Sequence, residues 1–192
     1  MPSFFGHAVA GVALGAAFAD EKAPRRTLVL GTLCALAPDL DSFTLFLPLH
    51  PGNFLAHRGI SHSLLAAVLL AAGVLMLGFK REQRSLRVGV YLLLASLSHG
   101  LLDACTSGRI GVAFFYPFSA SRWGCYWQPF LDAPLPFWPG LRLPFLGALL
   151  GEALWIGVPG LLLVGAVRRI RNFSDWFTLP STLPEVEAES EG

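Results

Sequence analysis

Histidine, aspartate and arginine residues recur beside apolar runs in this sequence. The stretch FLAHRGISHSLLAAVLL (residues 54–70) places two histidines directly before such a run. His99 and Asp103 lie four positions apart, so their side chains share one helix face and can bind one ion together. Asp39 and Asp41 add two carboxylates in APDLDSF. Imidazole nitrogen with carboxylate oxygen suits Zn²⁺, and also Mn²⁺ or Fe²⁺, and the lack of cysteine ligands favours a catalytic over a closed structural site.

The two aspartates could bind one metal only if the backbone changes direction between them. Residues two positions apart diverge by about 200° on a helical wheel. Pro38 favours a break here, so we expect the regular helix to stop near Ala37.

The two histidines of HRGISHS would also diverge on a continuous helix, because they are five positions apart. We therefore expect His57 in a loop and a turn at Gly59. Ser61 is the expected N-cap, with His62 in the first helical turn.

The composition is that of a membrane protein. Hydrophobic residues make up 54% of the 192 residues, charged residues only 14%, and the mean hydropathy is +0.57. A net charge of +1 without a continuous basic patch argues against nucleic-acid binding. The three cysteines lack CxxC spacing, so we expect no disulfide framework and treat them as small apolar residues. The N-terminal segment lacks the pattern of a cleaved signal peptide, and we expect it to be retained.

The expected fold is an all-α, polytopic membrane helical bundle of about five apolar helices. These helices are predicted at residues 4–19, 28–47, 61–79, 88–104 and 143–167. Lysine and arginine gather after the first, third and fifth segments, which predicts a multi-pass protein of the bacterial cytoplasmic (inner) membrane with a cytoplasmic C-terminus. The membrane domain is expected over residues 1–171, followed by an acidic, disordered cytoplasmic tail over 172–192. The aromatic, proline-rich connection over residues 106–142 is expected on the outer membrane surface.

The polar residues that are costly to bury in lipid share one depth in this topology. Counting ~1.5 Å per helical residue places each of them about 18–27 Å from the nearest basic residue of the cytoplasmic side. That level is near the outward side of a hydrocarbon core ~30 Å thick. The residues concerned are His7, Asp39, His62, His99, Asp103 and Glu152.

The motifs PDLD, HRGISHS, HGLLD and TSGRIGVAFFYPF resemble the YdjM-like family of bacterial inner-membrane proteins, described as membrane-bound metal-dependent hydrolases, over about residues 1–170. Its distant similarity to zinc-dependent phospholipase C and single-strand nucleases implies an all-α fold with a multinuclear zinc site that cleaves phosphoesters. By that similarity Asp103 is a candidate bridging ligand, Asp39 or Asp41 a further carboxylate, and His7 a ligand of a second ion. Ala148 stands where that superfamily has a late histidine, so a third metal would lack this ligand.

The preferred hypothesis is a metal-dependent hydrolase that uses one or two divalent ions, zinc before manganese or iron. Its expected substrate is a phosphoester of a lipid or lipid-linked molecule at the outer membrane face. The candidate metal ligands are His7, Asp39, Asp41, His57, His62, His99, Asp103 and Glu152. Asp39 or Asp41 is the expected general base, and Arg58, Arg109 and Arg122 are expected to contact phosphate. The alternative is a non-enzymatic membrane protein with a structural metal site, such as an assembly factor or an ion-handling protein.

Overall fold

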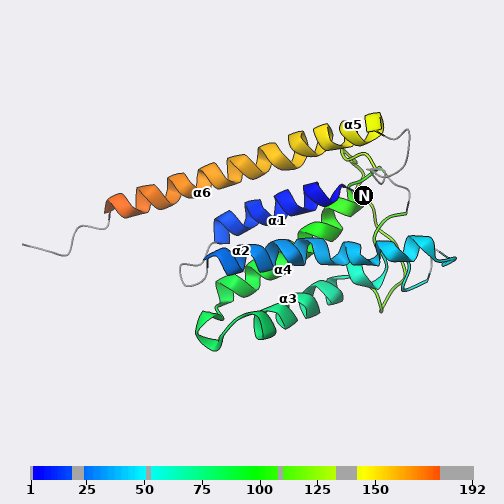
Figure 1. The fold of residues 1–192 in the computed structure, drawn as a ribbon, viewed down its shortest axis with the longest axis horizontal. Helices are drawn as coiled ribbons and strands as arrows, with labels where there is room; N and C mark the ends of the chain where they lie inside the picture. Colours follow the sequence, from blue (N-terminus) through cyan, green and yellow to red (C-terminus); the bar gives the residue numbers. More distant parts are fainter. Residues whose placement is uncertain (1, 19–23, 51–52, 108–109, 133–141, 178–192) are drawn as a thin grey trace, which may run out of the picture.

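The computed structural model describes residues 2–18, 24–50, 53–107, 110–132 and 142–177, and this part of the chain is helical (Figure 1). The α-helices are α1 (Phe4–Phe18), α2 (Pro24–Leu36), α3 (Leu64–Gly78), α4 (Leu86–Ala104), α5 (Arg142–Glu152) and α6 (Val158–Phe177). Shorter helical segments join them: the 3₁₀ helices η1 (Ala37–Phe46), η2 (Ile60–His62) and η3 (Arg81–Gln83), and the π-helix η4 (Ala153–Gly157). The predicted all-α class is confirmed.

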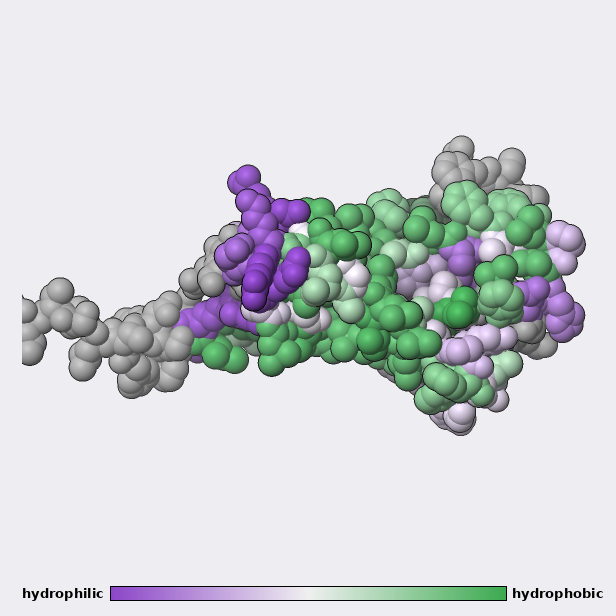
Figure 2. Space-filling model, turned by 90° about the horizontal axis from the view of Figure 1, so that it is seen from below, coloured by the Kyte–Doolittle hydropathy of each residue, from purple (hydrophilic) through white to green (hydrophobic). Residues whose placement is uncertain are grey.

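Within the described residues, three helical stretches are long and apolar enough to cross a membrane: Pro24–Phe46, Leu86–Ala104 and Phe145–Arg171. The helices α1 and α3 are apolar but shorter. Figure 2 shows a hydrophobic middle of the molecule, with hydrophilic residues gathered towards its two ends. This distribution matches a helical bundle whose middle lies in the hydrocarbon layer.

The predicted proline break is confirmed. Helix α2 ends at Leu36, and the chain continues as η1 with Pro38 in its first turn. Proline lacks the N–H that an α-helix would need at this position, and the tighter 3₁₀ turn takes over. Both Asp39 and Asp41 therefore lie in a 3₁₀ segment.

The N-cap of α3 lies two residues after the predicted one. Ser63, not Ser61, is the N-cap, because its hydroxyl oxygen accepts a hydrogen bond from Ala66 N at 3.1 Å. Ser61 and His62 instead lie in η2, directly before the cap. Both serines fit the capping rule by type, and only the backbone path decides between them.

Helix α4 forms the centre of the bundle and packs against α1, α2 and α3. Tyr91 lies at this centre, and its hydroxyl donates to the carbonyl oxygens of Gly11 at 2.9 Å and Leu28 at 3.3 Å. A Cβ added at Gly31 would lie 2.1 Å from the Tyr91 ring. Glycine is therefore required where α2 crosses this tyrosine.

Helix α6 lies along α1 at one side of the bundle (Figure 1). α5, η4 and α6 follow one another without a gap in sequence, so the predicted fifth segment extends to Phe177, past the expected boundary at residue 171. The rest of the predicted tail, residues 178–192, lies outside the described residues.

The expectation of no disulfide was wrong. Cys105 and Cys125 form one, while Cys34 is a buried free thiol. Cys105 follows the last residue of α4, and the loop returns so that Cys125 N donates to Ala104 O at 2.8 Å. Spacing rules miss such a pair because the return of the loop, rather than a short CxxC turn, brings the two residues together.

Candidate metal centre

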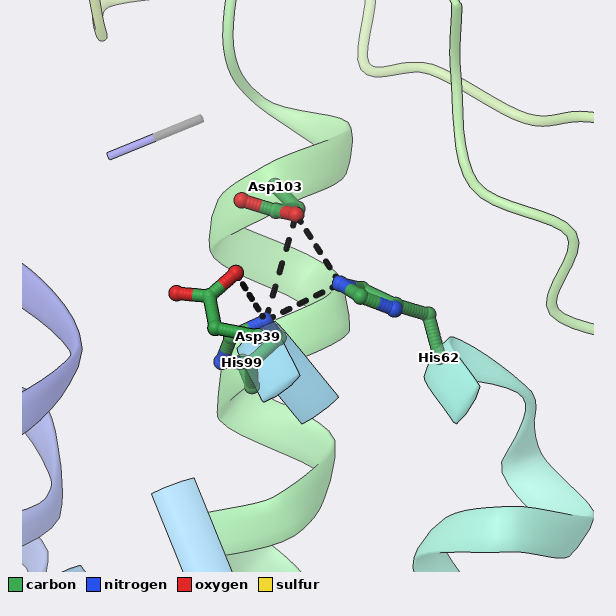
Figure 3. Close-up of side chains that lie close together, drawn as sticks. All are labelled: Asp39, His62, His99 and Asp103. Atoms are coloured by element: carbon green, nitrogen blue, oxygen red, sulfur yellow. Dashed lines mark hydrogen bonds and ion pairs between the residues drawn. The ribbon is translucent and has the colours of Figure 1, made fainter. Parts of the chain in front are cut away.

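Four side chains from three segments converge near one end of the bundle (Figure 3). Asp39 comes from η1, His62 from η2, and His99 and Asp103 from α4. One ligand atom of each lies within 4.8 Å of the others. Three of the four are buried, and Asp39 retains only 11% of its side-chain exposure.

The ligand atoms are spaced as around a single ion. His62 Nε2 lies 3.0 Å from His99 Nε2 and 3.2 Å from Asp103 Oδ2. His99 Nε2 lies 3.4 Å from Asp39 Oδ1 and 3.9 Å from Asp103 Oδ2. Ligands bound to tetrahedral zinc at ~2.0–2.1 Å are about 3.3–3.4 Å from one another. The four side chains therefore fit a tetrahedral ion with two histidine and two carboxylate ligands.

The hydrogen bonds behind the two histidines assign their tautomers. His99 Nδ1 lies 2.7 Å from the carbonyl oxygen of Ala35, which can only accept, so Nδ1 carries the hydrogen. His62 Nδ1 lies 3.1 Å from Asp41 Oδ2, which favours the same tautomer. Both Nε2 lone pairs then face the same point, and two lone pairs this close need a positive charge between them.

The carboxylates support a cation at this point. In the described part of the chain, no hydrogen bond of good geometry reaches the buried oxygens of Asp39 or Asp103, and Asp103 has the Arg58 guanidinium as a cationic neighbour at 3.2 Å. Buried carboxylate oxygens without donors are costly unless a charge compensates them. A divalent ion would satisfy both carboxylates and both histidines at once.

Asp41 belongs to a neighbouring group with His57 and His62. Its oxygens accept from His57 Nδ1 at 2.6 Å, from Arg58 N at 3.2 Å and from the Ser61 hydroxyl. The 2.6 Å distance is that of a hydrogen bond and is shorter than ligand separations around a tetrahedral ion. Asp41 therefore orients the two histidines from behind.

His7 lies on the other side of the same carboxylates. Its Nε2 is 3.5 Å from Asp103 Oδ1 and 3.9 Å from Asp39 Oδ2, and its ring stacks on His99 with centroids 3.8 Å apart. His62 and His99 face the other oxygen of each carboxylate, Asp103 Oδ2 and Asp39 Oδ1. The His7 imidazole can therefore hydrogen-bond the oxygens of Asp39 and Asp103 that face away from His62 and His99.

Arg58 reaches into the centre although it is a loop residue. Its side chain is 3% exposed, with Nε 3.2 Å from Asp103 Oδ2 and Nη2 3.7 Å from Asp132 Oδ1. Its backbone has φ 62°, a left-handed conformation that costs about 1–2 kcal/mol outside glycine. The bonds from Arg58 N to Asp41 and from Ala113 N to Arg58 O hold this conformation.

Gly59 makes the predicted turn possible through its lack of a side chain. A Cβ at this position would lie 2.4 Å from the carbonyl oxygen of Phe54. The turn sends His57 and His62 towards Asp41 from two directions, with ring centroids 5.4 Å apart. The predicted loop at His57 and turn at Gly59 are confirmed, whereas the cap is Ser63 instead of Ser61, and His62 lies before the cap rather than in the first turn of α3.

Glu152 is placed differently from the ligand role predicted for it. Its carboxylate accepts hydrogen bonds from the backbone N–H and the hydroxyl of Ser3, just before α1. It is not in either group of converging ligand atoms in the described residues. Glu152 also lies against Gly6, the neighbour of His7 in the sequence.

Two arginines were predicted to contact phosphate besides Arg58. Arg109 lies outside the described residues. Arg122 donates through Nη1 to the carbonyl oxygens of His57, Arg58 and Gly111 at 3.3–3.4 Å, so it supports the loop that carries Arg58. Partial burial and the charge of Arg58 lower the pKa of Arg122.

Sequence reasoning missed the roles of Ser61 and Asp132 at the centre. The Ser61 hydroxyl binds Asp41, and Asp132 pairs with Arg58. Its place inside HRGISHS is the one indication in the sequence that Ser61 lies at the centre. Asp132 belongs to no motif of the sequence. It reaches Arg58 only because the loop that follows Cys105 returns to the end of α4.

Comparisons with known proteins were made for the whole chain. The family model described as YdjM inner membrane protein matches residues 1–173. The inner membrane protein YbcI of Escherichia coli (strain K12) is 30% identical over 167 residues, which cover 86% of this chain and 96% of that protein. No solved structure gives a significant match. The extent of the family match, across all the segments that carry the four converging side chains, shows that this chain belongs to the YdjM inner membrane protein family.

Proposed function

We propose that this protein is a membrane-embedded, metal-dependent hydrolase that cleaves a phosphoester of a lipid or lipid-linked substrate. The observation that carries the proposal is the convergence of two histidine nitrogens and two carboxylates at one largely buried point. A bound zinc ion would polarise a phosphoester oxygen and make hydroxide available near neutral pH.

His57 is the proposed general base. Asp41 holds its Nδ1 at 2.6 Å, which leaves Nε2 as the nitrogen that can take up a proton. A carboxylate that fixes the tautomer of a catalytic histidine is a recurrent arrangement in hydrolases. Asp41, which accepts several hydrogen bonds, acts in this proposal by positioning rather than by proton transfer.

Arg58 could serve either an enzyme or a structural metal site. Its buried guanidinium lies beside the ligand Asp103, where it would bind an anionic oxygen next to the ion. An outer hydrogen bond can orient a metal-binding carboxylate in any metal site, so the hydrolysis assay, and not the Asp103 contact alone, separates the two roles of Arg58. The alternative is a non-enzymatic membrane protein with a structural metal site.

The proposed active site faces the outer side of the cytoplasmic membrane. The Cys105–Cys125 disulfide lies beside the metal-centre end of α4, and disulfides persist on the oxidising side of this membrane. At the opposite end of the bundle, Arg87 and Arg171 donate to the carbonyl oxygen of Ala17, the position expected of cytoplasmic basic residues.

The first test is elemental analysis of purified protein beside Asp103→Ala and Asp132→Asn. We expect stoichiometric zinc, manganese or iron in the wild type and in Asp132→Asn, which changes only a carboxylate that pairs with Arg58. Asp103→Ala should lose the metal. Metal-free wild type after purification without chelators would overturn the metal centre and the hydrolase together.

The second test separates an enzyme from a structural metal protein. Wild type in mixed micelles should release the phosphorylated head or free phosphate from a panel of phospholipids and polyprenyl phosphates. Arg58→Lys should keep its metal and lose about 100-fold in rate, because a lysine cannot replace the bidentate donors. Full metal occupancy with no hydrolysis of any phosphoester would favour the structural role.

A further inference from the structure

An apolar groove runs between α1 and the η4–α6 segment. Two adjoining cavities of about 150 and 430 Å³ make up this groove. Val9 and Gly157 line both of them, so the two hollows form one continuous surface feature. A third cavity of about 250 Å³ lies on the other side of the contact between Ala13 and Gly160, against α4.

The walls of the groove suit a hydrocarbon chain. The largest cavity is lined only by glycine, alanine, valine and leucine from α1, η4 and α6. Its glycines, Gly157 and Gly160, provide depth, while Val9 and Val12 leave about half of their surface open, at 43% and 46% exposure. Within the lining residues, no polar side chain could pair with a peptide or a headgroup in this cavity.

The groove has the direction and the length of one lipid leaflet. Its outer end is lined by Gly6 and Glu152, and Gly6 directly precedes His7 of the metal centre. It extends along α6 to Val164. At ~1.5 Å per residue the stretch from Glu152 to Val164 is about 18 Å long. The outer half of a hydrocarbon core ~30 Å thick is about 15 Å deep.

We propose that this groove binds one hydrocarbon chain of an outer-leaflet lipid, with the phosphate head at the level of the metal centre. The identification of this lipid as the substrate rests on the proposed function. A lipid of the outer leaflet has its head outward and its chain towards the midplane, which is the direction from Gly6 to Val164. A chain held there would bring a phosphoester to the depth at which His7 begins the site.

The test uses a phosphatidylglycerol whose acyl chain carries a photoreactive diazirine, reconstituted with the full-length protein in phosphatidylethanolamine vesicles. Cross-linked peptides should map to residues 8–13 and 157–164. Gly157→Leu fills the groove without a clash, because a Cβ there has its nearest neighbour at 4.0 Å. Labelling in this variant should fall by about tenfold, as expected when a chain gives up roughly two buried methylene groups.

Gly165→Leu is the matched control, since it adds the same side chain to the same helix at a position with nothing within 4 Å and outside the groove lining. It should label like the wild type. Equal labelling of Gly157→Leu and wild type, or labelling spread evenly over all apolar helices, would overturn the proposal. Self-association that Gly157→Leu abolishes, with labelling unchanged, would assign the groove to a second copy instead.

Labelling needs no turnover, so the two proposals fail separately. His99→Ala, which lacks a metal ligand, should still label in the groove. Groove labelling without any phosphoester hydrolysis would leave the lipid site standing and remove the hydrolase. Hydrolysis at the wild-type rate by a Gly157→Leu variant whose groove is not labelled would leave the hydrolase standing and remove the groove as the site of its substrate.

Discussion

The hydrogen bonds behind each histidine determine what the centre can bind. Ala35 O and Asp41 take the Nδ1 hydrogens of His99 and His62, and this leaves both Nε2 atoms 3.0 Å apart as acceptors. Outer partners of this kind orient metal-binding histidines and raise their basicity. At the residue scale Asp41 is thus as important to the geometry as the ligands themselves.

Asp41→Asn tests this role. An amide can present N–H groups to His57 and His62 instead of accepting from them, which disturbs both tautomers. We expect metal affinity to fall by about 10–100-fold, with full occupancy recovered at excess metal. Chelator competition followed by elemental analysis measures the change. Ser42→Ala is the control from the same 3₁₀ segment, because its buried hydroxyl has no hydrogen-bond partner in the described residues. Unchanged affinity in Asp41→Asn would show that Asp41 does not support the ligands.

At the scale of elements, one helix organises the site. Helix α4 carries His99 and Asp103 on the face that packs against α1 and α2, and the same packing brings His7 and η1 to them. Close approach of α2 to α4 depends on Gly31, which faces the Tyr91 ring. The position of the metal ligands near one end of the bundle therefore depends on a small-residue contact deeper in it.

Gly31→Ala is expected to destabilise the bundle by about 3 kcal/mol, since its Cβ would lie 2.1 Å from the Tyr91 ring. Thermal unfolding in detergent measures the loss. Gly73→Ala, in α3 with nothing within 4 Å, should be neutral or slightly stabilising. In the Tyr91→Ala background, Gly31→Ala should cost much less than it does in the wild type, because the ring that the new Cβ would meet is gone. A wild-type melting temperature for Gly31→Ala would refute the packing described here.

At the scale of the whole molecule, the loop that follows α4 lies over the end of the bundle that holds the candidate ligands. The disulfide joins Cys105, two residues after Asp103, to Cys125. Arg122 in the same loop binds the carbonyl oxygens of His57 and Arg58, and Asp132 pairs with Arg58. One connection thus stabilises the segments on both sides of the metal centre.

The disulfide can be tested by alkylation. Denatured protein should expose only the Cys34 thiol before reduction and all three cysteines after it, as read by mass spectrometry. Replacing Cys105 and Cys125 together with serine should lower stability by about 3 kcal/mol, the value for a loop of similar length. Cys34→Ala serves as the control that keeps the bond. Three reactive thiols in protein purified under oxidising conditions would rule out the pairing.

The proposed orientation makes a separate prediction. A reporter fused after residue 192 should be active in the cytoplasm, because the basic residues of α4 and α6 gather at that end. A reporter inserted in the loop after Ser119 should be active only outside. The opposite pair of readings would place the metal centre on the cytoplasmic face.

The sequence by itself determined the membrane class, the approximate helices, the break at Pro38 and the residue types of the centre, because hydropathy, periodicity and proline chemistry act over a few neighbouring residues. It also brought His99 and Asp103 together through their spacing on one helix. Only the tertiary structure separated Asp39, which faces the ion site, from Asp41, which faces His57. The disulfide and the place of Glu152 beside Ser3 likewise depend on where loops and helices return in space, and no local pattern encodes those distances.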